Sequence, residues 1–192
     1  MDEAAYRQYV TYKNAGRKAQ AKVALGAFLA SLKPADDTQA WTKAFLEGED
    51  VGHQIRHEIY ERLVFPVLWQ GYEQNDAWSL LWLAKTVNNL YRSPALHALI
   101  GYKSERELLM EAYRLQPSDE VQQLLLNADL RFFAYSQHEW PAGILYGSDG
   151  ASLAECDDIL QQVSFARGLD TGDNEAFLNA FESKVREYKM RL

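Results

Sequence analysis

Four side chains that can bind metal ions recur at every fourth position of one segment: Glu49, His53, His57 and Glu61. On an α-helix this spacing advances by only about 40° per step, so the four side chains would form one row. Two imidazoles one turn apart can share a metal ion, and carboxylates can complete a site of the kind that zinc prefers. The row is not the HExxH motif of metalloproteases, because Gln54 stands where that motif requires glutamate. It predicts either a metal site on one helix or side-chain pairs that only stabilise the helix; we favour the second and expect no cofactor.

The only cysteine of the chain is Cys156. It follows Ser152, which we expect to cap a helix, and the positive end of a helix dipole lowers the pKa of a thiol. Asp157 and Asp158 oppose this effect, because neighbouring negative charges disfavour the thiolate. We therefore expect a structural thiol rather than a nucleophile, and a protein that is not an enzyme.

The segment from His138 to Gly150 differs from the helical sequence on both sides of it. Pro141 and three glycines exclude a long helix, yet the segment is rich in aliphatic and aromatic residues that water rejects. One interpretation is structural: its aromatic side chains clamp the C-terminal helices onto the long helix before it. The other is a binding surface, in which aromatic anchors stand inside a charged rim. The residues of this hypothetical surface are Trp140, Tyr146, Asp149, Glu155, Asp157 and Asp158.

The elements that position these residues all repeat at the helical period. Apolar residues recur three and four positions apart, and no segment alternates between apolar and polar residues as a strand would. From Val51 the pattern predicts a helix with two apolar faces, which Pro66 kinks or restarts. Ser104 with Glu107, and Ser152 with Glu155, are typical of capping boxes at helix starts. We expect an all-α protein of about ten helices, either a bundle or stacked helical hairpins.

The length of 192 residues is compatible with one domain. We expect a single α-helical domain over residues 1–192, with a helical hairpin at 1–33 followed by the main body at 37–192. No apolar run approaches the roughly 18 residues of a membrane span, and the N-terminus does not resemble a secretion signal. These features predict a cytoplasmic protein that binds no membrane.

The net charge of −7 is unevenly distributed along the chain. Seven Lys and Arg residues against four Asp and Glu residues give positions 1–43 a charge of +3, so the rest of the chain carries −10. We interpret the N-terminal positive charges as a solvated helix face. Acidic proteins repel nucleic acid, so we expect a basic protein as the partner and no nucleic acid.

Two resemblances point to interaction proteins. Ala112 and Pro117, five residues apart, resemble the end of a tetratricopeptide repeat, which implies a stacked-hairpin scaffold that binds peptides. The segments 57–66 (HEIYERLVFP) and 138–147 (HEWPAGILYG) resemble bacterial immunity proteins, which neutralise toxins. That second resemblance implies a non-enzymatic cytoplasmic protein whose acidic face covers a basic toxin domain.

Three hypotheses therefore follow from the sequence. The first is an interaction module, of the immunity kind, that binds a toxin domain through an acidic face. The second is a metal-binding helical enzyme or sensor that uses His53 and His57. The third is a helical-repeat scaffold for peptides.

Overall fold

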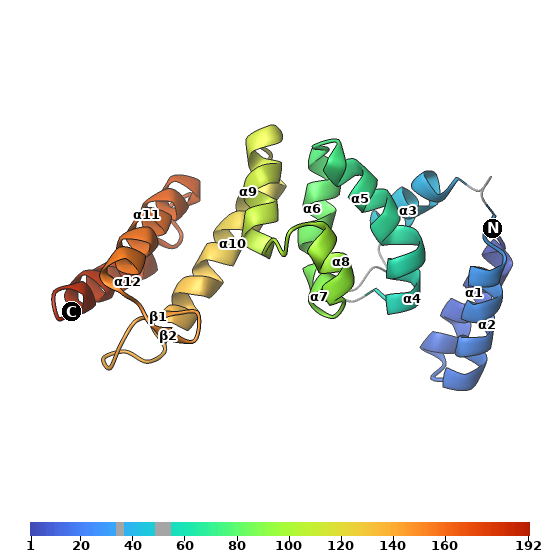
Figure 1. The fold of residues 1–192 in the computed structure, drawn as a ribbon, viewed down its shortest axis with the longest axis horizontal. Coiled ribbons are helices and arrows are strands. Elements are labelled where there is room, and N and C mark those ends of the chain that lie inside the picture. The colour runs from blue at the N-terminus through green and yellow to red at the C-terminus, as the bar shows by residue number, and fades with distance from the viewer. Residues whose placement is uncertain (34–36, 49–54) are drawn as a thin grey trace. The chain divides into compact units, whose positions relative to one another are not determined.

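The computed structural model describes residues 1–33, 37–48 and 55–192. The expected all-α fold is confirmed, because 72% of the described residues are helical. The elements in chain order are α1 (Glu3–Asn14), α2 (Lys18–Ala30), α3 (Thr38–Leu46), α4 (His57–Ile59), the π-helix η1 (Tyr60–Val64), α5 (Phe65–Glu73), α6 (Ala77–Lys85), α7 (Val87–Tyr91), α8 (Pro94–Leu99), α9 (Glu105–Leu115), α10 (Asp119–Ser136), β1 (Leu145–Tyr146), β2 (Asp149–Gly150), α11 (Leu153–Leu169) and α12 (Glu175–Lys189) (Figure 1).

The chain forms two compact units, and each unit consists of two separate stretches of the sequence. Unit 1 consists of Met1–Gln74 and Lys85–Tyr102, and unit 2 of Asn75–Ala84 and Lys103–Leu192. The hairpin expected at 1–33 is present as α1 and α2, and it lies in unit 1 together with α3, α4 and α5. The single domain expected from the sequence stays a prediction.

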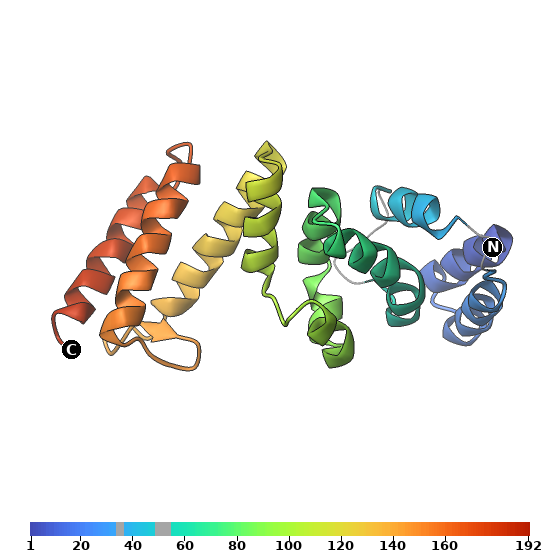
Figure 2. The same ribbon diagram turned by 45° about the horizontal axis from the view of Figure 1, so that its top comes forward.

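Aromatic side chains hold the first three helices of unit 1 together. α1 and α2 lie side by side in both views (Figure 1 and Figure 2), joined by a turn at Gly16, whose φ of 69° suits glycine. Tyr6 on α1 and the fully buried Phe28 on α2 have ring centroids 5.1 Å apart. Trp41 on α3 lies 5.6 Å from Phe28 and 5.4 Å from Tyr6. Aromatic pairs at such distances stabilise beyond the area they bury, so the hairpin is fixed to α3.

The helical segment does not end at Pro66; α5 begins at Phe65, directly after the π-helix η1, with Pro66 in its first turn. Proline has no N–H to donate and its ring crowds the preceding turn. The chain widens into η1 just before it, where the Phe65 N–H donates to the Tyr60 carbonyl, five residues back. The hydroxyl of Thr42 on α3 donates to the Leu63 carbonyl at 3.3 Å, which satisfies a carbonyl of this altered turn. The helix therefore continues through the proline by means of a π-turn.

The start of that helix differs from the expectation. A helix from Val51 was expected, but Ile55 and Arg56 are not helical, and α4 begins at His57; Val51 itself lies outside the described residues. The reason is Asn89 on α7, whose amide oxygen accepts from the Ile55 N–H at 3.2 Å and whose amide nitrogen donates to the Ile55 carbonyl at 2.7 Å. These two buried hydrogen bonds occupy the backbone groups that a helix would use.

Most of unit 2 consists of helices, each of which packs on the next helix along the chain. The capping boxes expected at Ser104 and at Ser152 are both present, at the starts of α9 and α11. α9 packs on α10, α10 on α11, and α11 on α12. Between α10 and α12, the rings of Phe133 and Phe181 stack at 4.8 Å with both side chains fully buried. No described helix is long and apolar enough to span a membrane.

A charged pair also joins α9 to α10. Arg106 Nε donates to Asp129 Oδ1 at 2.5 Å, and the Asp129 side chain is fully buried. The second oxygen, Oδ2, has no hydrogen-bond partner among the residues that the structure describes. Burial raises the pKa of Asp129, and the bond to Arg106 only partly offsets this rise.

The segment 138–150 packs against helices of its own unit, unit 2, as the structural interpretation of the sequence expects. Ile144 is fully buried, and the Tyr135 hydroxyl donates to the Gly147 carbonyl at 3.0 Å. A short antiparallel ladder of β1 and β2, which the sequence did not predict, pairs Leu145 with Gly150 around the tight turn at Gly147 (Figure 2). The segment is therefore held by local hydrogen bonds as well as by the helices.

Candidate functional site

Half of the row of potential metal ligands lies within the described residues. His57 Nε2 and Glu61 Oε2 lie 3.5 Å apart, and both side chains are about half exposed. Glu49 and His53 lie outside the described residues. Because Ile55 and Arg56 are not helical, no continuous helix carries the row into His57. Among the residues that the structure describes, no three potential ligands are close enough to hold a metal ion, and the metal site stays a prediction.

The two aromatic residues of the hypothetical binding surface both have packing partners. The guanidinium of Arg191 lies 4.7 Å from the centre of the Trp140 ring, and it also donates to the Pro141 carbonyl at 3.0 Å. Tyr146 meets Phe132 of α10 edge to face at 6.1 Å. Both aromatic residues remain partly exposed. They therefore stabilise the segment and still offer apolar surface to a partner.

The acidic residues of the same surface divide into two kinds. The Glu155 carboxylate accepts from the N–H and the hydroxyl of Ser152 at 2.8 and 2.7 Å, and these hydrogen bonds lower its pKa. Asp157 pairs with Lys189 of α12. Asp149 and Asp158 are exposed and form no ion pair within the described part of the chain. The latter two are the members that a partner could reach directly.

Negative charge is concentrated in unit 2. Unit 1 contains eleven Lys and Arg residues against ten Asp and Glu residues, a net charge of +1. Unit 2 contains nine against seventeen, a net charge of −8. The net negative charge of the chain therefore lies in unit 2 rather than being spread over both units.

A polar hollow on unit 2 adds acidic groups that the sequence analysis did not single out. It has a volume of about 290 Å³, and its lining includes Asp119 at the start of α10 and both Asp170 and Asp173 between α11 and α12. Asp170 accepts two hydrogen bonds from Asn174, at 3.0 and 2.8 Å, which lower its pKa. Two segments about fifty residues apart supply these carboxylates, so only the packing of α10 on α11 reveals them.

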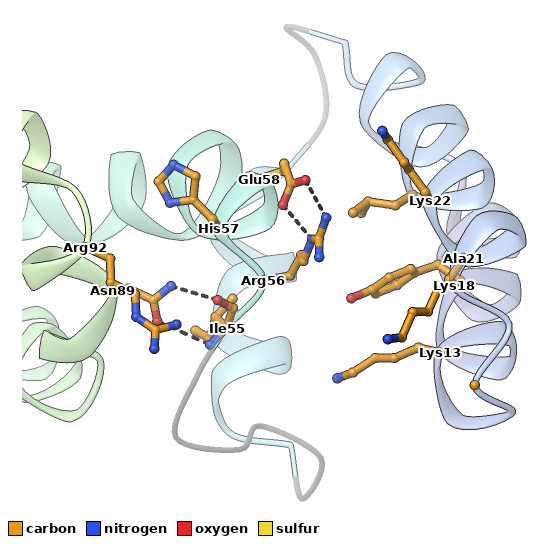
Figure 3. A pocket seen from close by; sticks show the side chains of 13 residues that line it. Lys13, Lys18, Ala21, Lys22, Ile55, Arg56, His57, Glu58, Asn89 and Arg92 are labelled. Carbon is orange, nitrogen blue, oxygen red and sulfur yellow. Dashed lines mark hydrogen bonds and ion pairs between the residues drawn. The ribbon is translucent and has the colours of Figure 1, made fainter.

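Unit 1 contains a larger pocket, which the sequence analysis also missed. Its volume is about 880 Å³, and it lies between the α1–α2 hairpin and the segment that leads into α4 (Figure 3). The lining residues are Tyr9, Lys13, Gly16, Lys18, Ala21, Lys22, Leu25, Ile55, Arg56, His57, Glu58, Asn89 and Arg92. Positive side chains from both sides of the pocket are prominent in this set.

The cysteine behaves as the sequence predicted. Cys156 is fully buried on α11, and burial raises the pKa of its thiol. The nearby Lys189 lowers that pKa, but Asp157 and Glu155 raise it further. A thiol that is protonated and shielded from solvent is a poor nucleophile.

Comparison of the chain with protein-family models, curated proteins and solved structures finds no match. The resemblances to immunity proteins and to tetratricopeptide repeats thus remain predictions. Function has to be argued from the distribution of charge and from the geometry of the surfaces.

Proposed function

We propose that the protein is a non-enzymatic interaction module that binds a basic protein partner through the acidic surface of unit 2. The observation that carries the proposal is the division of charge, with −8 on unit 2 against +1 on unit 1. Complementary charge speeds the encounter of two proteins and suppresses wrong partners. An acidic unit of this kind suits a partner with a strongly basic surface.

The segment 138–150 supplies the apolar part of the proposed interface. Trp140 and Tyr146 are partly exposed and are fixed by Arg191 and Phe132. Aromatic side chains that are already held in place lose little entropy on binding, so they make effective anchors. The exposed carboxylate of Asp149 lies in the same segment and contributes to the charged rim.

The resemblance to immunity proteins suggests the class of the partner. A toxin domain that acts on nucleic acid needs a basic surface to bind its substrate. An acidic protein that covers this surface would block the substrate without any chemistry of its own. We therefore propose a basic toxin domain as the partner.

Affinity capture from native lysate tests the proposal when it is combined with charge variants. The triple variant Asp149→Asn/Asp158→Asn/Asp173→Asn removes three exposed carboxylates from unit 2. We expect the wild-type protein to capture a basic protein, and we expect the variant and raised salt each to weaken the capture. Co-expression should then show that the chain suppresses the toxicity of the captured protein.

A matched control variant shows whether capture depends on the acidic surface of unit 2 or only on the net charge of the chain. The variant Glu3→Gln/Glu61→Gln/Glu73→Gln removes the same number of exposed carboxylates from unit 1. It should capture the partner as well as the wild-type chain does. Equal loss of capture in both variants, or capture that is indifferent to salt, would contradict the proposal.

A further inference from the structure

The pocket of unit 1 carries a strong excess of positive charge. Its lining contains five cationic side chains, those of Lys13, Lys18, Lys22, Arg56 and Arg92. The one carboxylate that the described residues contribute to the lining, that of Glu58, is held by Arg56 through two hydrogen bonds of 2.7 and 2.8 Å. The three lysines form no ion pair with any residue in the described ranges, and Figure 3 shows Lys13 and Lys18 extending from the hairpin toward the opposite wall.

The start of α2 adds to this positive potential. Lys18 is its first residue, and Lys22 lies one turn later, so two like charges are neighbours on the helix surface. The N-terminus of a helix carries a partial positive charge and favours anions. No side chain caps this end, and no acidic residue lies in the first turn. A bound anion would compensate both the lysines and the helix end.

Tyr9 points to the same kind of ligand. Its side chain is 6% exposed, and it lines the pocket. Its hydroxyl forms no hydrogen bond with another described residue and is not among the polar atoms sealed from solvent. Burial raises the pKa of Tyr9, while the nearby charge of Arg56 lowers it in part. The hydroxyl is therefore protonated at neutral pH and available to donate a hydrogen bond to an anion.

The inner wall of the pocket is apolar. Ala21, Leu25 and Ile55 are buried residues that line it together with the Tyr9 ring. The volume of about 880 Å³ falls within the range of roughly 300–1,000 Å³ that small-molecule sites occupy. A site with apolar walls and cations around them suits a ligand that combines an apolar body with a charged end.

The geometry points to a binding site for a phosphorylated small molecule of about nucleotide size. In this proposal its phosphate groups contact Lys13, Lys18, Lys22 and the Tyr9 hydroxyl, and its apolar body lies against Leu25 and Ile55. This site belongs to unit 1 and is independent of the acidic surface of unit 2.

Titration calorimetry on the full chain tests the site with three probes: ATP, inorganic triphosphate and adenosine. We expect ATP to bind, triphosphate to bind more weakly because it lacks a nucleoside to pack against the apolar wall, and adenosine not to bind detectably. The affinity for ATP should fall as salt is raised, because exposed charges are screened. Absence of ATP binding, or equal affinity for ATP and triphosphate, would overturn the proposal.

Two pairs of substitutions locate the site. Lys18→Gln/Lys22→Gln should weaken ATP binding at least tenfold, because a hydrogen bond to a charged group typically contributes about 1.5–3 kcal/mol and 1.4 kcal/mol corresponds to a factor of ten. Arg7→Gln/Arg62→Gln removes the same charge from exposed positions outside the pocket and should leave the affinity within about twofold. Equal weakening in both double variants would show non-specific attraction and refute the site.

Two further measurements test whether ATP contacts the Tyr9 hydroxyl and whether the pocket binds any acidic chain. Tyr9→Phe should weaken ATP binding several-fold without lowering the melting temperature, because the hydroxyl has no partner among the described residues. A short polyglutamate peptide should not displace ATP at equal charge concentration. Displacement by the peptide would refute a small-molecule site in favour of a groove for an acidic chain.

Discussion

Removal of the Arg106 guanidinium is expected to destabilise unit 2 more than any other single loss of charge described above. Asp129 is fully buried, and one of its oxygens already has no hydrogen-bond partner within the described part of the chain. In Arg106→Met, the carboxylate loses the cation that pairs with it, while the aliphatic part of the arginine side chain is kept. Breaking a buried pair in this way costs about 3–5 kcal/mol. Arg106 is 29% exposed, so we expect the lower end, which corresponds to a fall in Tm of roughly 6–12 °C.

A second arginine provides a matched control on the same two helices. Arg131 of α10 pairs with Glu105 of α9 at 2.8 Å, but the Arg131 side chain is 59% exposed. An exposed pair of this kind contributes about 0–1 kcal/mol. Arg131→Met should therefore shift urea unfolding only slightly, although it removes the same charge from the same helix pair.

The pH dependence of the stability lost in Arg106→Met tests whether the unpaired Asp129 carboxylate causes that loss. Burial raises the folded-state pKa of Asp129, so folding favours the protonated carboxyl. This contribution to stability is fully present below the pKa of the unfolded chain and is lost as the pH rises through the folded-state pKa. Arg106→Met removes the group that opposed the rise, so its destabilisation relative to wild type should shrink as the pH falls.

The reasoning would be refuted by either of two results in urea unfolding over a series of pH values. One is an equal loss of stability in Arg106→Met and Arg131→Met. The other is a loss in Arg106→Met that stays constant down to acidic pH. The double variant Arg106→Met/Asp129→Leu should regain most of the lost stability, because no buried charge is left without a partner.

Three further predictions concern single residues. Asn89→Ala should destabilise the chain by about 2–3 kcal/mol in urea unfolding, because it leaves a buried backbone N–H and carbonyl without partners. Gly150→Ala should cost less than about 1 kcal/mol, because the added Cβ would lie 2.9 Å from the Tyr188 hydroxyl oxygen, the far end of a partly exposed side chain that can shift; Gly143→Ala, with its Cβ 3.8 Å from the same side chain, should change the Tm still less. Cys156 should react with a thiol reagent only after unfolding, because it is buried and its pKa is raised; rapid reaction of the native chain would contradict this.

Local signals in the sequence were sufficient to predict most helices and several of their ends. The capping boxes at Ser104 and Ser152 depend only on residues three positions apart, so they form irrespective of tertiary contacts. The segment 138–150 was recognised in the same way, from its proline, its glycines and its aromatic residues. Its β-ladder was not predicted, because two residues per strand leave no detectable alternation.

Features that depend on tertiary contacts could not be predicted. The apolar spacing of Ile55 and Ile59 is that of a helix, but hydrogen bonds from a distant part of the chain hold Ile55 in a non-helical conformation. The lysines of α2 were interpreted as a solvated face, because the sequence does not show that Arg56 lies across a pocket from them. Only the packing of unit 1 shows that three of the N-terminal lysines, Lys13, Lys18 and Lys22, line a pocket.

The side-chain amide of Asn89 forms the same pair of hydrogen bonds with Ile55 that a neighbouring β-strand would form: it accepts from the Ile55 N–H and donates to the Ile55 carbonyl. One wall of the cationic pocket is in this way anchored to α7, a helix thirty-four residues further along the chain. A change in α7 that shifted this amide would reshape the pocket without touching a lysine. Ligand affinity in unit 1 would then respond to substitutions at a helix that supplies little of the charge.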